Sequence, residues 1–182
     1  MSALALVRHG RTRWNLERRL QGRSDLALDE VGEQEALAAA RTLAAWEWVN
    51  VVSSPLDRAR ETARIIANEL GTGLPQVDDD LIERDYGLAE GFTVHEAQRL
   101  WPEGDYPLAE STAALAERTR AALARLCALS EPTVVVGHGA FLRAGIEAVT
   151  GEGFPRLLNG DVVLASALRL AGTSRAFHLL AR

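Results

Sequence analysis

LVRHGRTRWN, residues 6–15, is the stretch of sequence that decides the fold and first raises the question of function. It continues a short apolar run over residues 4–7, which is typical of a buried strand. Arg8, His9 and Gly10 come directly after that run, and two more arginines and an asparagine follow by the end of the stretch. Charge this dense after a buried strand indicates either a solvated loop or a site for an anion, and the stretch alone leaves both interpretations open.

Strand-like and helix-like segments alternate along the rest of the chain. Apolar β-type runs occupy residues 49–52, 76–77, 133–136, 162–170 and 175–180, with a turn at Gly172 between the last two. Helical spacing fills residues 29–46, 54–70, 94–100, 111–129 and 139–150. This alternation predicts an α/β fold, a three-layer α/β/α sandwich with a mostly parallel central sheet. No repeat or linker interrupts it, so we expect residues 1–182 to form a single domain.

Two of these helices have ends and faces that can be predicted in more detail. The helix at residues 54–70 should begin with Ser54 as its cap, carry Asp57 at the capping-box position and stop at Gly71. The helix at residues 29–46 should present one apolar face, made of Leu37, Ala40, Leu43 and Ala44.

The composition excludes several classes of protein and site. Every one of the 20 basic residues is arginine, which removes Schiff-base chemistry and the lysine of a phosphate-binding P-loop. Cys127 is the only cysteine, so neither an intrachain disulfide nor a cysteine-based zinc site can form. The net charge of −5 argues against a nucleic-acid binder. Residues 8–23 alone carry six arginines and one acid, and this local positive charge suits a small anion.

Hydropathy and the N-terminal residues bear on location. The chain is 47% hydrophobic, and no apolar run approaches the roughly 20 residues that a membrane span needs. The first seven residues lack the basic leader of a signal peptide. We therefore expect a cytoplasmic protein with no membrane partner.

Charged clusters follow three of the predicted strands, and the carboxyl ends of parallel strands meet at one edge of a sheet. The clusters are Arg8-His9-Gly10, then Ser53-Ser54-Pro55 with Arg58 one turn later, and Gly137-His138-Gly139. Arg58 should lean back toward that edge from the first turn of its helix. The glycines, Gly139 included, let the backbone approach a ligand closely. Together these features predict a site for a phosphate-sized anion.

Histidine is the natural nucleophile for such a site, because lysine is absent and no serine or cysteine lies between bases. Arginine forks match phosphate oxygens and neutralise their charge. Attack by an imidazole nitrogen on phosphorus would give a phosphohistidine, which water then hydrolyses. The leaving group needs a proton, and residues 81–87 offer carboxylic acids for it. A bound phosphate would raise the pKa of such an acid by like-charge repulsion.

The order of motifs resembles that of the histidine phosphatase superfamily, in its phosphoglycerate-mutase-like branch. Residues 8–15 match its Arg-His-Gly-x-Thr-x-x-Asn signature, and four further motifs follow in family order. These are Gln21-Gly22, residues 53–59 with Thr62-Ala63, residues 81–87 with Glu90-Gly91, and residues 137–139. The resemblance covers most of the chain and implies an α/β/α sandwich, a phosphatase and a site that needs neither metal nor cofactor.

The resemblance also implies a role for each matching residue. His9 would be the nucleophile, and Glu83 the proton donor and later the base. Arg8, Arg58 and His138 would clamp the phosphoryl group. The pocket and its rim would be lined by Asn15, Gln21 and Gly22.

Departures from the family pattern favour hydrolysis over mutase chemistry. Arg11 and Arg13 stand where many relatives carry glutamate, and Ala89 where a tryptophan is frequent, so contacts to the substrate should differ from those of the mutases. The stretch between Glu83 and His138 is short of the lid material that a mutase needs to exclude water. We therefore expect a phosphatase for a small phosphorylated metabolite, with a cofactor-dependent phosphoglycerate mutase as the alternative.

Other possibilities stay open at this point. A metal-dependent hydrolase and a non-catalytic module that binds a phosphorylated ligand would use some of the same residues. The identity of the substrate, the roles of Arg11 and Arg13, and the oligomeric state, a homodimer included, cannot be read from the chain.

Overall fold

Apolar runs form the centre of a six-stranded sheet in the computed structural model, which describes residues 3–166 and 176–180. The spatial order of the strands is β3-β2-β4-β1-β5-β6. Their bounds are β1 Leu4–Arg8, β2 Asn50–Ser53, β3 Gln76–Val77, β4 Thr133–Gly137, β5 Val162–Ser166 and β6 Ala176–Leu179. The predicted strands at residues 4–7, 49–52, 76–77 and 133–136 are therefore confirmed to within a residue. Residues 167–170, the predicted turn at Gly172 and Arg175 lie outside the described residues.

Strand direction and register bring three chain segments to one edge of the sheet. β1 runs parallel to β4, with Arg8 opposite Gly137, and β2 runs parallel to β4, with Ser53 opposite Val136. β2 and β3 are also parallel, whereas β5 is antiparallel to both of its neighbours. The sheet is thus mostly parallel, as predicted, and the three central strands end at the same level.

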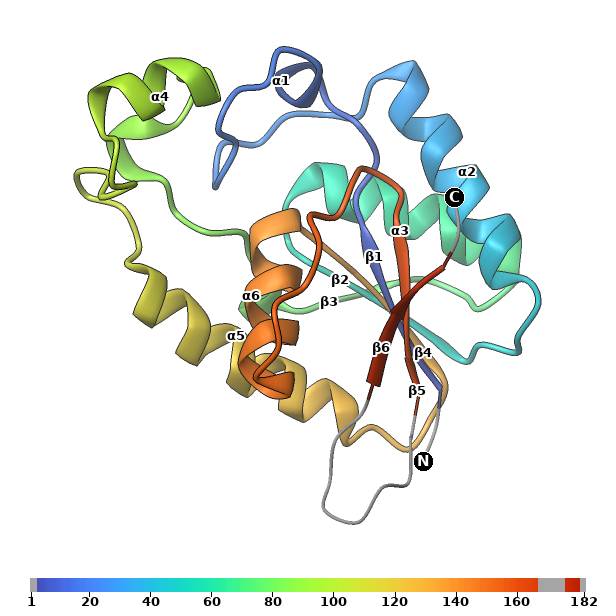
Figure 1. Cartoon of the computed structure of the whole chain (residues 1–182). Coiled ribbons are helices and arrows are strands. Elements are labelled where there is room, and N and C mark those ends of the chain that lie inside the picture. Colours follow the sequence, from blue (N-terminus) through green and yellow to red (C-terminus); the bar gives the residue numbers. More distant parts are fainter. Residues whose placement is uncertain (1–2, 167–175, 181–182) are drawn as a thin grey trace.

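Helices cover both faces of the sheet (Figure 1). α2 and α3 pack on one face against Ala5, Val7 and Val134, and α5 and α6 pack on the other against Leu6 and Val135. The three-layer sandwich is therefore confirmed. The α-helices are α1 Arg13–Leu16, α2 Glu30–Leu43, α3 Asp57–Leu70, α4 Val94–Leu100, α5 Thr112–Cys127 and α6 Gly139–Thr150, with 3₁₀ turns η1 Asp79–Leu81 and η2 Gly87–Ala89.

Two details of the helices differ from the prediction. The buried face of α2 is made of Ala36, Ala39, Ala40 and Leu43, whereas Ala44 is exposed. This shift by one residue turns a row of small alanines toward the sheet and α3, which allows close packing. α3 begins at Asp57 with Leu56 at its N-cap, and Ser54 does not cap it because the Ser54 hydroxyl is engaged with a histidine. The predicted stop at Gly71, in the left-handed conformation, is confirmed.

Beyond the edge where β1 ends lie α1 and α4 with their connecting loops (Figure 1). An isolated bridge between Arg19 and Thr93 joins these two regions, which are far apart in the sequence. None of the helices in the described part of the chain has the length and apolar character to cross a membrane. The assignment of residues 1–182 to a single domain stays a prediction.

Candidate active site

The edge of the sheet where β1, β2 and β4 end collects the five residues predicted to be catalytic. His9 follows β1, His138 is the N-cap of α6 after β4, and Arg58 lies in the first turn of α3. The rings of His9 and His138 have centroids 5.1 Å apart. His9, Arg58, Glu83 and His138 are all buried, with Arg58 and His138 at 0% exposure. Side chains this polar are buried together only where they are paired or serve a ligand.

His9 is held with one ring nitrogen free for chemistry. Its Nδ1 donates to the carbonyl oxygen of Gly10 at 2.7 Å, so the unprotonated lone pair of a neutral ring is on Nε2. The backbone N–H of His9 donates to the carbonyl of Gly137 and fixes the residue against β4. Burial, followed by the charges of Arg58 and Arg8, lowers the pKa of His9 well below its usual value of 6.5. The ring is therefore neutral and nucleophilic at physiological pH.

His138 has the opposite arrangement, because its Nε2 is the ring nitrogen that has a partner. Ser54 Oγ accepts from the N–H of Leu56 and lies 2.7 Å from His138 Nε2, so its hydroxyl proton can be donated to that nitrogen. The proton of a neutral ring is then on Nδ1, which is buried and has no partner among the described residues. Burial, with the charges of Arg58 and His9, lowers the pKa of His138 well below 6.5.

The two arginines are fixed by hydrogen bonds to carbonyl oxygens. Arg8 Nη1 donates to Leu157 O at 2.7 Å. Arg58 donates to Ser24 O at 2.9 Å and to Gly22 O at 2.7 Å. The Nε atoms of both arginines are buried with no partner in the described structure. Burial lowers the pKa of Arg58 to about 10, so its guanidinium still carries a charge.

Unpaired buried donors are concentrated at this edge. Six buried side-chain atoms have no partner among the described residues, and four of them are the nitrogens Arg8 Nε, Arg58 Nε, His138 Nδ1 and Gln21 Nε2. The other two are hydroxyls, of Ser53 and Thr72. Each unsatisfied donor costs about 1–3 kcal/mol. A ligand rich in acceptors, such as a phosphoryl group, suits unpaired donors of this kind.

Glu83 reaches the site from the segment after η1 and binds the start of α6. Its Oε1 accepts from the N–H groups of Arg84 and Phe141, and its Oε2 accepts from Ala140 at 3.1 Å. The N–H groups of Ala140 and Phe141 in the first turn of α6 are thus occupied by this carboxyl group. Burial raises the pKa of Glu83, although these N–H groups and Arg58 favour the carboxylate. The pKa is therefore raised before any phosphate binds.

Asn15, Gln21 and Gly22 lie beside the site, but they differ in what they can offer a ligand. Asn15 Oδ1 accepts from Thr12 N and from Asn159, and Asn15 Nδ2 donates to Gln21 Oε1, so its amide is engaged within the protein. Gln21 keeps its Nε2 unpaired. Gly22 supplies a carbonyl oxygen to Arg58, and a Cβ there would lie 2.2 Å from Glu90.

The glycines of the charged clusters serve chain packing more than ligand entry. A Cβ on Gly10 would lie 2.2 Å from the carbonyl oxygen of Gly32 in α2, so the space beside Gly10 is filled by backbone. A Cβ on Gly139 would lie 3.3 Å from Arg8 Nε, so this glycine allows Arg8 to lie against the start of α6. The expectation that Gly10 opens the site to the ligand is therefore wrong, because α2 occupies that side.

Arg11 and Arg13 both form ion pairs with acids. Arg11 Nε forms an ion pair with Asp29 at 2.9 Å. Arg13, with 81% of its side chain exposed, pairs with Glu17 one helical turn later. Both arginines therefore have partners within the protein, and much of the positive charge of residues 8–23 is neutralised locally.

Thr62 and Glu90, which belong to the family motifs but had no predicted role, and Asn159, which the sequence did not single out, support the site. Thr62 Oγ1 accepts from Gly10 N at 3.0 Å and donates to Arg58 O, and its position one turn after Arg58 could have indicated this. Glu90 accepts from the N–H groups of Arg23 and Ser24 and from the Ser24 hydroxyl, which holds the loop that binds Arg58. Only the fold brings Asn159 to His9, because 150 residues separate them.

Aromatic side chains line one side of the rim. Tyr106 contacts the rings of Tyr86 and Trp101, and the guanidinium of Arg84 lies over both tyrosines. Burial and the nearby Glu83 raise the pKa of Tyr86. Tyr86 therefore stays a neutral phenol beside the buried acid.

Comparison with known proteins agrees with this geometry. A family model described as the histidine phosphatase superfamily, branch 1, matches residues 4–181. The chain belongs to that superfamily. This histidine phosphatase is 38% identical over 168 residues to the uncharacterized phosphatase PhoE of Bacillus subtilis. The alignment covers 91% of this chain and 86% of PhoE.

Two other relatives indicate the range of the superfamily. A probable phosphoglycerate mutase, GpmB of Cronobacter sakazakii, is 35% identical to this chain over 165 residues. The alignment covers 83% of this chain and 76% of GpmB. The solved structure of a mycobacterial glucosyl-3-phosphoglycerate phosphatase with VO3 superposes with a TM-score of 0.82 at 28% identity, covering 98% of this histidine phosphatase and 97% of that chain. The predicted family, fold and enzyme class are confirmed.

Proposed function

We propose that the protein hydrolyses a small phosphomonoester through a phosphohistidine on His9, with Glu83 as general acid and base. The observation that carries this proposal is the group of four buried, unpaired nitrogens beside a neutral His9 whose Nε2 is free. An anion with several acceptor oxygens satisfies those nitrogens, and an imidazole lone pair is the nucleophile nearest to it.

In the first step, His9 Nε2 forms a bond to phosphorus while the bond from phosphorus to the ester oxygen breaks. Glu83 gives its proton to the departing alkoxide and becomes a carboxylate. Oε2 is the oxygen with room for that proton, because it accepts one N–H whereas Oε1 accepts two. Arg8, Arg58 and His138 bind the phosphoryl oxygens and stabilise the charge that develops on them.

In the second step, the Glu83 carboxylate takes a proton from a water molecule. The hydroxide oxygen bonds to phosphorus, the bond to His9 Nε2 breaks, and inorganic phosphate leaves. The imidazole regains its lone pair, and Glu83 is again protonated. The cycle consumes one ester and one water and needs no metal, and the described residues include no cluster of His, Cys, Asp or Glu able to hold one.

A phosphoglycerate mutase is the second candidate, and the similarity to a probable mutase is the observation that favours it. The two activities differ in the acceptor of the phosphoryl group, which is water or a second alcohol. A coupled assay for 2-phosphoglycerate, with and without 2,3-bisphosphoglycerate, separates them. Phosphate release without the bisphosphate supports hydrolysis, and turnover that depends on the bisphosphate supports the mutase.

The substrate class is tested by a screen for phosphate release. We expect a small phosphorylated metabolite of the cytoplasm to be hydrolysed, and sugar phosphates, phosphoglycerates and phosphoserine form the first panel. The His9→Ala variant is the blank. If the wild type releases phosphate from no monoester while still binding one, the protein is a binding module and the proposed hydrolysis is wrong.

A further inference from the structure

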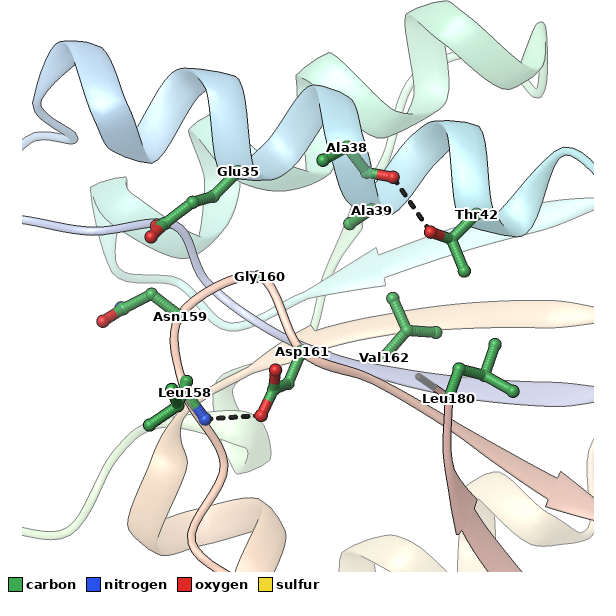
Figure 2. A pocket seen from close by; sticks show the side chains of 10 residues that line it. All are labelled: Glu35, Ala38, Ala39, Thr42, Leu158, Asn159, Gly160, Asp161, Val162 and Leu180. Carbon is green, nitrogen blue, oxygen red and sulfur yellow. Dashed lines mark hydrogen bonds between the residues drawn. The ribbon is translucent and has the colours of Figure 1, made fainter. Parts of the chain in front are cut away.

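A cavity of about 350 Å³ lies behind the nucleophile, between α2 and the turn at residues 158–161. Figure 2 shows Glu35 on its α2 side and Asn159 on the turn. Both side chains bind the backbone that carries His9. Glu35 Oε2 accepts from the N–H of Arg11 at 2.7 Å, and Asn159 Nδ2 donates to the carbonyl of His9 at 3.0 Å.

The Glu35 contact leads directly to the catalytic ring. The N–H of Arg11 and the carbonyl of Gly10 belong to the same peptide group. That carbonyl accepts the proton of His9 Nδ1 at 2.7 Å. The carboxylate of Glu35, one peptide group and the imidazole of His9 therefore form a continuous hydrogen-bonded chain. Bonds in such a chain polarise one another, so negative charge at Glu35 strengthens the carbonyl as an acceptor.

Close packing of backbone on backbone fixes this chain. Cβ atoms built on Gly10 and Gly32 would each lie 2.2 Å from a carbonyl oxygen of the other segment, so only glycine allows this approach. Glu35 follows Gly32 by three residues, on the same side of α2. From the other wall, Gly160 has a positive φ of 74°, and a Cβ there would lie 3.0 Å from Glu35 Cβ.

We propose that Glu35 is a positioning residue for the phosphoryl transfer, which acts on His9 through the Gly10–Arg11 peptide group. Its negative charge makes the His9 ring a better nucleophile and stabilises the positive imidazole ring of the phosphohistidine. The proton stays on His9 Nδ1 throughout, and Glu35 neither accepts nor donates one. This inference rests on the proposed function, because it assigns a role in the formation of the same intermediate.

The charge of Glu35 is favoured by its hydrogen bond and by neighbouring arginines. Burial is the largest influence and raises the pKa of Glu35 on balance, whereas the N–H and the guanidinium of Arg11 favour the carboxylate. Asp29 raises the pKa and Arg8 lowers it by their charges, and Asp161 lies across the cavity on the turn. The Arg11–Asp29 ion pair, which phosphate transfer itself does not require, thus lies beside the carboxylate that we assign to positioning.

The decisive variant is Glu35→Gln, because an amide oxygen can still accept from Arg11 while the charge is lost. Single-turnover experiments with a radiolabelled phosphomonoester measure phosphoenzyme formation and decay separately. We expect formation to slow about 10-fold and decay to become faster, because a less basic imidazole is the better leaving group. KM and the melting temperature should stay close to those of the wild type.

Glu33→Gln is the matched control, since it removes the same charge from an exposed position on the same helix. It should leave both rate constants unchanged. Equal rate constants in the wild type and in Glu35→Gln would overturn the proposal, and so would equal slowing of formation in Glu35→Gln and Glu33→Gln. Failure of the wild type itself to form a phosphoenzyme would instead contradict the proposed function, so the two failures are distinguishable.

Discussion

Each residue of the site has its protonation state set by burial and by a short list of neighbours. His9 stays neutral because burial and two arginines disfavour its cation. Glu83 lies 5% exposed, and burial holds its proton more tightly than water would. Burial thus lowers the pKa of the nucleophile and raises that of the acid at the same edge of the sheet, and both shifts favour the protonation states that phosphoryl transfer to histidine needs.

The role of Glu83 predicts a dependence on the leaving group. In Glu83→Gln, we expect hydrolysis of an alkyl phosphate to fall about 10²–10⁴-fold, because the alkoxide leaves without a proton. Phosphorylation by p-nitrophenyl phosphate should fall far less, since nitrophenolate needs no proton to leave. Rapid-quench kinetics on both substrates measure this difference. Equal losses on the two substrates would show that Glu83 does not act as the acid.

The two shifted pKa values predict the pH profile of kcat/KM. Activity should fall as the pH decreases through the lowered pKa of His9, because the cation has no lone pair. It should also fall as the pH rises through the raised pKa of Glu83, because the carboxylate has no proton to give. In the wild type the alkaline limb should be present for an alkyl phosphate and missing for p-nitrophenyl phosphate, because nitrophenolate leaves without a proton. An alkaline limb of equal size on both substrates would rule out Glu83 as its source.

Residues of the site were predictable where type and spacing carry the information. His9, Arg58 and His138 follow strands or begin helices, so their meeting at one edge could be expected from the sequence. The partners of Arg11 and Arg13 were not predictable, because a surface arginine can pair with several acids and only the folded chain selects one. The contact of Glu35 with the N–H of Arg11 was not predictable either, because Glu35 fits the pattern of an ordinary amphipathic helix.

At the scale of elements, register and close backbone contacts assemble the site. Strand ends at equal height place the catalytic groups, and the Gly10–Gly32 contact locks the loop after β1 against α2. Strand positions were predictable because apolar β-branched runs are unambiguous. The start of α3 was not, because the hydroxyl suited to capping, Ser54, contacts His138 from a different element instead.

The variant Gly32→Ala tests whether the Gly10–Gly32 contact matters for catalysis. The new Cβ would lie 2.2 Å from Arg11 O, and we expect a loss of about 1–3 kcal/mol in the free energy of unfolding. That clash outweighs the gain of about 1 kcal/mol from replacing a helical glycine. Affinity for vanadate should weaken as well, because the loop that carries His9 shifts.

Denaturant unfolding and vanadate titration measure both effects. Gly153→Ala is the control, since a Cβ there meets nothing within 4 Å, and its stability should match that of the wild type. If the Gly32→Ala protein is as stable as Gly153→Ala and binds vanadate as tightly, the Gly10–Gly32 contact does not fix the loop that carries His9.

At the scale of the whole molecule, one buried group of unpaired donors marks the proposed anion site on a chain of net charge −5. Arginines near the N-terminus are largely paired with acids, so the attraction is confined to the pocket. The overall α/β/α architecture was predictable from alternating patterns and from the family resemblance. The pairing that confines the charge was not, because it depends on contacts such as that of Arg23 with Asp85.

A confined anion site predicts the response of the whole protein to vanadate and chelators. Vanadate should inhibit, and at 100 times its Kd it should stabilise the fold by about 2.7 kcal/mol. EDTA should leave the rate unchanged. Thermal unfolding with vanadate measures the stabilisation, and Arg58→Ala is the control in which the stabilisation should be lost. Inactivation by EDTA with recovery on adding a divalent metal would instead support a metal-dependent hydrolase.

The most direct test of the central claim is to trap the phosphoenzyme. The wild type, mixed with a ³²P-labelled phosphomonoester and quenched in alkaline denaturant within milliseconds, should carry label that is stable to base and lost in acid. Peptide mapping should place that label on His9. The His9→Ala variant should carry none, and Glu83→Gln mixed with labelled p-nitrophenyl phosphate should accumulate it, because this leaving group needs no acid while the base for the second step is missing. Turnover by the wild type without any such label, or label on another residue, would contradict the account.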